Sequence, residues 1–114
     1  MTTLYGIPNC DTVKKARKWL DEKSISHHFH DFRKDGLSEA LLTSFLEKTA
    51  WDQLLNKRST SFRNLSDDVK NNLDEATAKA AMLAEPTLIK RPVTVVGDEI
   101  LVGFKADTFA NKFA

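Results

Sequence analysis

The chain has 114 residues, with 17 Lys and Arg, 16 Asp and Glu, three His and a single Cys. We expect one domain spanning residues 1–114, because a chain of this length buries about two-thirds of its unfolded surface. The formal net charge of +1 lacks the basic excess of nucleic-acid-binding proteins, and no apolar run approaches the ~18 residues of a membrane helix. One cysteine excludes an internal disulfide and every multi-cysteine zinc site. The chain does not start with a basic segment followed by an apolar one, so we expect an unprocessed cytoplasmic protein.

The first third of the chain predicts a β-α-β unit. Residues 2–7 are short and apolar-rich and end in a Gly and a Pro, which is typical of a buried strand. A helical stripe then predicts a helix over about 10–23, with Asn9 as its N-cap. The more polar stretch 26–32 suits a second strand at the edge of a sheet.

The middle of the chain predicts a helical insert at about 37–83. Its clearest helix is capped by Ser66 and carries an apolar stripe that continues to Leu83. The other expected segments are a helix capped by Ser38, a helical turn at 51–55 and a polar, basic loop at 56–64.

The last part of the chain predicts a β-β-α unit. Two β-branched runs, 93–96 and 100–102, flank Gly97-Asp98 and indicate a hairpin, and residues 107–113 form a final helix. Joining the β-α-β and β-β-α halves gives an α/β fold with a four-stranded mixed sheet. This is a thioredoxin-like arrangement with the helical insert between the two halves.

Cys10 lies where the first strand passes into the first helix. Free backbone N–H groups and the positive end of the helix dipole favour a thiolate there. Lowering the pKa of a thiol from about 8.5 to about 6 takes roughly 3.4 kcal/mol, whereas a helix terminus gives about 1 kcal/mol. Hydrogen bonds to the sulfur or a nearby cation must therefore supply the rest. The alternative is that Cys10 is a small buried apolar residue.

Three cations are candidates for stabilising this thiolate or for binding an anionic substrate. Lys14 lies one turn after Cys10, Arg58 lies in the polar loop, and Arg91 precedes Pro92. Lys14 also belongs to a short basic face with Lys15, Arg17 and Lys18, which is either a solvated helix surface or a feature that steers an anionic partner. For each arginine the alternative is a solvated surface charge.

Three histidines, His27, His28 and His30, cluster in the second predicted strand. His28 and His30 share a strand face, and two histidines can begin a metal site, with Asp31 nearby. We favour the interpretation that they belong to a polar edge strand, and we expect no bound metal.

Three segments, Leu4–Thr12, Leu54–Ser59 and Ile89–Val93, together resemble the ArsC/Spx family. This family holds glutaredoxin-linked arsenate reductases and the Spx regulators that bind RNA polymerase. The resemblance covers nearly the whole chain and looks closest to the YffB-type branch, proposed as glutathione-dependent thiol reductases. It implies the thioredoxin-like fold with a helical insert.

Carried over to this sequence, the resemblance implies that Cys10 is the reactive cysteine and that Arg91 precedes a cis proline, Pro92. Arg58, Arg91 and Lys14 are the expected substrate- or anion-binding residues. Asn9, Thr12 and Pro92 are expected to shape the site.

Four positions depart from the patterns of the family. The first and third oxyanion-binding arginines of arsenate reductases fall on Asn56 and Gly103. The second cysteine of many Spx proteins falls on Val13, and their polymerase-contacting glycine falls on Ala50. Without a second cysteine, any redox chemistry must finish with an external thiol.

We therefore expect an arsenate-reductase-like thiol reductase that uses Cys10 as its only nucleophile. No cofactor is expected to be bound, and glutathione is the expected co-substrate, so that glutathione or glutaredoxin is the partner. One alternative is an Spx-like regulator that binds RNA polymerase. The other is a thioredoxin-fold adaptor whose cysteine takes part in no reaction.

Overall fold

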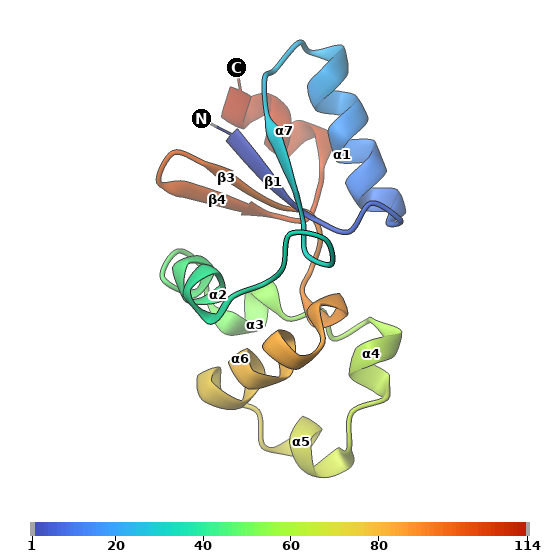
Figure 1. The fold of residues 1–114 in the computed structure, drawn as a ribbon, viewed down its shortest axis with the longest axis vertical. Helices are drawn as coiled ribbons and strands as arrows, with labels where there is room; N and C mark the ends of the chain where they lie inside the picture. The colour runs from blue at the N-terminus through green and yellow to red at the C-terminus, as the bar shows by residue number, and fades with distance from the viewer. Residues whose placement is uncertain (1, 114) are drawn as a thin grey trace. The chain divides into compact units, whose positions relative to one another are not determined.

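The computed structural model describes residues 2–113, which form two compact units (Figure 1). The chain up to Gly36 and the chain from Arg91 onward make one of them, here called the sheet unit. The segment Leu37–Lys90 makes the other, here called the helical unit. Within residues 2–113, no helix combines the length and the apolar character needed to cross a membrane.

The sheet unit contains a four-stranded sheet in the order β2-β1-β3-β4. Strand β1 pairs in parallel with β2 and antiparallel with β3, and β3 pairs antiparallel with β4. The α/β fold, the mixed four-stranded sheet and the edge position of the second strand are thus confirmed. The elements are β1 (Thr2–Gly6), α1 (Asp11–Glu22), β2 (His28–Asp31), β3 (Val93–Val96), β4 (Glu99–Val102) and α7 (Ala106–Phe113).

Helices α1 and α7 cover one face of this sheet. The core there consists of five fully buried residues: Leu4, Val13, Ala16, Leu20 and Phe109. The register places Leu4 between Phe29 and Thr94, so these three side chains lie on the same covered face. On α1 the buried residues are Val13, Ala16 and Leu20, whose apolar spacing predicts this helix from the sequence.

Gly6 allows β1 and α1 to approach closely. A Cβ atom at this position would lie 2.8 Å from Cγ2 of Val13, closer than real Cβ contacts. The absence of a side chain therefore fixes how near the end of β1 lies to the first turn of α1, and with it the path of the chain into that helix.

The helical unit is built from short helices with well-defined N-caps. Ser38, Ser59 and Ser66 each accept a hydrogen bond from a backbone N–H in the first turn of the helix that follows. The elements are α2 (Glu39–Leu46), α3 (Trp51–Leu54), α4 (Thr60–Arg63), α5 (Asp67–Asn71), α6 (Glu75–Ala84) and the 3₁₀ helix η1 (Pro86–Leu88).

Two predictions for this unit are wrong. The expected loop 56–64 contains α4, because Ser59 caps a helical turn that the polar composition concealed. The expected single helix from Ser66 to Leu83 is two helices, α5 and α6. The chain restarts at Asp74, whose carboxylate accepts from the backbone N–H of Thr77 at 2.8 Å while the Thr77 hydroxyl receives the Asp74 N–H, also at 2.8 Å.

Candidate active site

Cys10 is the N-cap residue of α1. Its backbone is extended, with φ −127° and ψ 124°, and its carbonyl accepts the N–H of Lys14 at 2.9 Å. The prediction that Asn9 is the N-cap is wrong, because Pro8 and Asn9 form an exposed turn before the helix begins. The Cys10 side chain makes no capping hydrogen bond, so the N–H groups of the first turn have no side-chain cap.

Cys10 forms no disulfide within the chain, and the residue is half-buried. Cys10 packs against the core cluster that contains Leu4, Val13 and Phe109. It is therefore held by apolar neighbours on one side while part of its surface stays open to solvent. A nucleophile needs both properties, because it must be held in place and still be reached by a substrate.

The sheet topology brings Arg91 and Pro92 to the same end of the sheet as Cys10. Strand β1 ends four residues before Cys10, and its Tyr5 pairs with Val93, the first residue of the antiparallel strand β3. Arg91 and Pro92 come directly before Val93, and the peptide bond between them is cis, which confirms the isomer implied by the resemblance. Pro92 is buried, and its carbonyl accepts the N–H of Gly103 at 2.8 Å.

Arg91 is half-buried rather than a freely solvated surface charge. Its Nε is buried and has no hydrogen-bond partner in the part of the chain that the structure describes. An unpaired buried donor costs about 1–3 kcal/mol. The planar guanidinium carries several N–H donors that match the geometry of carboxylates and other oxyanions, so Arg91 is a candidate for binding an anionic substrate at this end of the sheet.

Two of the other predicted site residues belong to α1. Lys14 is exposed and Thr12 is half-buried, and both lie in the first turn of α1. Cys10, Thr12, Lys14, Arg91 and Pro92 thus all belong to the sheet unit.

Arg58 belongs to the helical unit, where it is exposed in the turn that precedes α4. Its backbone N–H donates to Oδ1 of Asn56 at 3.1 Å, and the Ser59 hydroxyl donates to the carbonyl of Asn56 at 2.8 Å. The N–H of Asn56 donates to the carbonyl of Leu88 at 2.7 Å. Asn56 therefore shapes the turn that carries Arg58, a role that the sequence analysis missed although Asn is a common turn residue.

Among residues 2–113, no group of three or more His, Cys, Asp and Glu side chains gathers as a metal site. Nε2 of His30 donates to the carbonyl of Gly36 at 2.7 Å. Nδ1 of His27 lies 2.9 Å from the carbonyl of Ile25, and His28 is exposed on the edge strand. The histidines thus take part in local backbone hydrogen bonding or face solvent.

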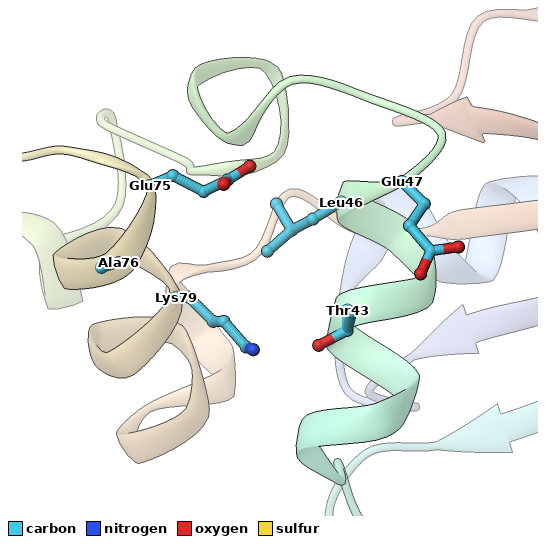
Figure 2. Close-up of a pocket in the computed structure, with 6 residues that line it drawn as sticks. All are labelled: Thr43, Leu46, Glu47, Glu75, Ala76 and Lys79. Atoms are coloured by element: carbon cyan, nitrogen blue, oxygen red, sulfur yellow. The ribbon is translucent and has the colours of Figure 1, made fainter.

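A groove separates α2 from α6 in the helical unit. Figure 2 shows the residues that line it: Thr43 and Leu46 of α2, Glu47 directly after that helix, and Glu75, Ala76 and Lys79 of α6. Lys79 is paired with Glu39 at 3.1 Å. The groove is lined by neither cysteine nor histidine, so we assign it no part in thiol chemistry.

The model of the ArsC family matches residues 5–111. The chain belongs to the ArsC family. It is similar over its whole length to the solved structure of a YFFB protein, with 45% identity, a TM-score of 0.95 and 100% of both chains covered. These findings confirm the family resemblance, including its YffB type, and the thioredoxin-like fold.

Other relatives cover almost the whole chain. An arsenate reductase (ArsC) related protein from Brucella melitensis is 46% identical with a TM-score of 0.82, covering 98% of this chain and 93% of that one. An uncharacterized protein of Haemophilus influenzae is 49% identical over 114 residues, all of both chains. The global transcriptional regulator Spx of Listeria innocua is 28% identical over 109 residues, 94% of this chain and 82% of Spx.

Proposed function

We propose that this protein is an arsenate-reductase-like thiol oxidoreductase in which Cys10 is the nucleophile and glutathione is the co-substrate. The observation that carries the proposal is the position of Cys10. It is a half-buried thiol at the uncapped N-terminus of α1, on the sheet end that also carries Arg91. Membership of the ArsC family and the likeness to the Brucella arsenate-reductase-related protein support this reaction class.

The reaction proceeds by successive thiol–disulfide exchanges. The Cys10 thiolate attacks one sulfur of a disulfide substrate, a new sulfur–sulfur bond forms, and the other sulfur leaves as a thiolate. A glutathione thiolate then attacks the Cys10 sulfur of this mixed disulfide, which releases the bound half of the substrate as a thiolate and leaves glutathione on Cys10. Another glutathione thiolate attacks that glutathione sulfur, which releases oxidised glutathione and restores the Cys10 thiolate. The second step needs an external thiol because position 13, where a dithiol oxidoreductase would carry its resolving cysteine, is Val13.

The residues around Cys10 have separate roles in this proposal. The first-turn N–H groups of α1 stabilise the sulfur anion. Arg91 and Lys14 hold the carboxylates of the substrate, while Asn9, Thr12 and Pro92 shape the site. Arg58 of the helical unit is a further candidate for binding an anion, and its support is the sequence resemblance to the ArsC/Spx family.

The decisive experiment measures glutathionylation of Cys10. We expect oxidised glutathione to give a single adduct by mass spectrometry in the wild type and none in Cys10→Ser. The Cys10 alkylation rate by iodoacetamide at pH 6 should exceed that of free glutathione. No adduct, together with alkylation no faster than that of free glutathione, would contradict the proposal.

The role of Arg91 is tested by kinetics. Arg91→Gln should raise KM for an anionic disulfide more than it lowers kcat, because Arg91 is proposed to bind the substrate rather than to react. Arg33→Gln is the matched control, because Arg33 is an exposed arginine of the same unit. Equal effects of the two substitutions would show that only net charge matters.

A chemistry that needs a free thiol is suited to the cytoplasm, where thiols are kept reduced.

The likeness to Spx favours a second candidate, a regulator that binds RNA polymerase. The discriminating measurement is a pull-down with the α subunit of RNA polymerase, using the wild type and Cys10→Ala. Binding by both proteins, with no glutathione adduct on Cys10, would select the regulator. Failure of both the adduct and the binding experiments would leave an adaptor without thiol chemistry.

A further inference from the structure

The charges on α1 run in the order that its helix dipole disfavours. The dipole favours anions at a helix N-terminus and cations at the C-terminus. Asp11 follows this preference, but the last turn has no basic residue and instead carries Asp21 and Glu22. The first two turns carry all four cations of the helix: Lys14, Lys15, Arg17 and Lys18. The arrangement concentrates positive charge on the half of α1 that begins at Cys10.

Three of these cations are free to meet a partner. Lys14, Lys15 and Lys18 are exposed, and none of them lies within ion-pairing distance of a carboxylate in the part of the chain that the structure describes. Of the three, Lys14 and Lys18 line a common surface depression. The guanidinium of Arg17 is held 4.3 Å above the ring of Phe29 on β2. A shallow depression on the outer side of α1 is lined by Lys14, Arg17, Lys18, Asp21 and Glu22.

The spacing of the two lysines indicates the size of the partner. Four residues apart, they share one helix face. At a rise of about 1.5 Å per residue, Lys14 and Lys18 lie about 6 Å and 12 Å along the axis from Cys10. A small disulfide whose carboxylates lie close to its sulfur reaches only the first of them. A strip that continues for a second turn matches an extended chain with several carboxylates.

We propose that Lys14 and Lys18 form a docking strip for an acidic segment of a protein or peptide disulfide whose sulfur is attacked by Cys10. The proposal rests on the proposed function and adds its substrate class. Cys10 forms a bond with one sulfur of the substrate, and the other sulfur leaves as a thiolate. Asp21 and Glu22 mark the far end of the strip, because they repel a further carboxylate. Asp11 weakens the strip near its start.

The test uses short peptides whose cysteine is activated as a mixed disulfide with thionitrobenzoate. One peptide carries Glu residues after the cysteine, and the other carries Gln at the same positions. Thionitrobenzoate release is followed by stopped-flow absorbance, and the readout is the ratio of the two rates. Lys14→Gln and Lys18→Gln should each lower this ratio about twofold at low ionic strength, the factor that Coulomb's law gives for unit charges about 8 Å apart in water.

Lys23→Gln is the matched control, because it removes the same charge from the exposed C-cap of the same helix. It should leave the ratio unchanged, since Lys23 lies about 20 Å along the axis from Cys10. The ratio should approach one at about 1 M salt, where the Debye length is about 3 Å. A small dianionic disulfide should respond to Lys14→Gln and not to Lys18→Gln.

Three results of the rate assay would overturn the docking strip. The first is a wild-type ratio of one between the rates with the Glu and Gln peptides. The second is a decrease of this ratio in Lys23→Gln as large as that in Lys18→Gln. The third is a rate with the small disulfide that Lys18→Gln lowers as much as it lowers the rate with the Glu peptide. Docking is also measured without chemistry, by adding the Glu peptide with serine for cysteine to the Cys10→Ser variant and following the backbone amide shifts of α1. Shifts along α1 without thionitrobenzoate release in the first assay would uphold the strip and reject the proposed function. Absence of shifts would reject the strip whatever the reactivity of Cys10.

Discussion

Gly6→Ala tests how the fold positions Cys10. The added Cβ would lie 2.8 Å from Cγ2 of Val13. Val13 is fully buried on the packed face of α1 and is β-branched, so its side chain has little freedom to rotate away. Either β1 or the first turn of α1 must then move, and the turn at Pro8 and Asn9 that leads to Cys10 must move with it.

Two opposing terms set the magnitude. Adding atoms to a well-packed core costs about 1–3 kcal/mol. Replacing Gly by Ala lowers the conformational entropy of the unfolded chain, which stabilises the folded protein by about 0.4–1 kcal/mol. Because the contact is with a rigid, buried side chain, the first term outweighs the second. We expect Gly6→Ala to lower the free energy of unfolding by about 1–2 kcal/mol and to slow alkylation of Cys10.

Urea unfolding followed by tryptophan fluorescence measures the effect in a double-mutant cycle with Val13→Ala. Val13→Ala alone should cost about 2 kcal/mol, because it removes two buried methyl groups and leaves a cavity. It also removes the atom that the new Cβ meets. The loss of unfolding free energy in the double mutant should therefore be smaller than the sum of the two single losses by about 1 kcal/mol or more. Strict additivity, or a Gly6→Ala protein as stable as the wild type, would refute this account of the contact.

Three further predictions concern stability. Thr94→Val should raise the free energy of unfolding by about 1 kcal/mol in urea titrations, because the Thr94 hydroxyl is fully buried and lacks a partner within residues 2–113. Phe109→Ala should lower it by about 3–5 kcal/mol, because Phe109 is a fully buried ring in the core of the sheet unit; a shift of the urea midpoint measures this. The backbone N–H and the hydroxyl of Thr77 hold the pKa of Asp74 below its usual value. The charged Asp74 carboxylate therefore stabilises the fold above about pH 4, and this stabilisation is lost as the pH falls through the lowered pKa. Asp74→Asn should therefore make the melting temperature fall less steeply on the acid side of a plot against pH.

The sheet unit was predictable because its signals are local. Strands β1, β3 and β4 are short apolar or β-branched runs bounded by Gly or Pro, β2 is a short polar edge strand, and the α1 stripe identifies the buried face of that helix. The helical unit was less predictable. The apolar stripe after Ser66 continues through Leu73, so periodicity alone predicts one helix. Helix α5 instead ends at Asn71, and the capping box between Asp74 and Thr77 begins α6, which is a local hydrogen-bond effect that periodicity does not detect.

The places of the candidate site residues in the fold were predictable only in part. A lone cysteine between a strand and a helix places Cys10 at the helix start, although the cap lies one residue later than Asn9. The unpaired Nε of Arg91 depends on which atoms of the folded chain surround it, and no sequence pattern carries that information. The role of Asn56 likewise depends on its N–H meeting Leu88, a contact between segments far apart in the sequence.

The structure explains in physical terms why Asn56 and Gly103 stand where arsenate reductases carry an arginine. Asn56 uses its side-chain oxygen to hold the N–H of Arg58, so it supports the turn rather than offering a charge. Gly103 adopts a φ of +82°, a left-handed conformation that costs other residues about 1–2 kcal/mol. Its N–H binds the carbonyl of Pro92. An arginine at either position would lose a local backbone role as it gained a charge.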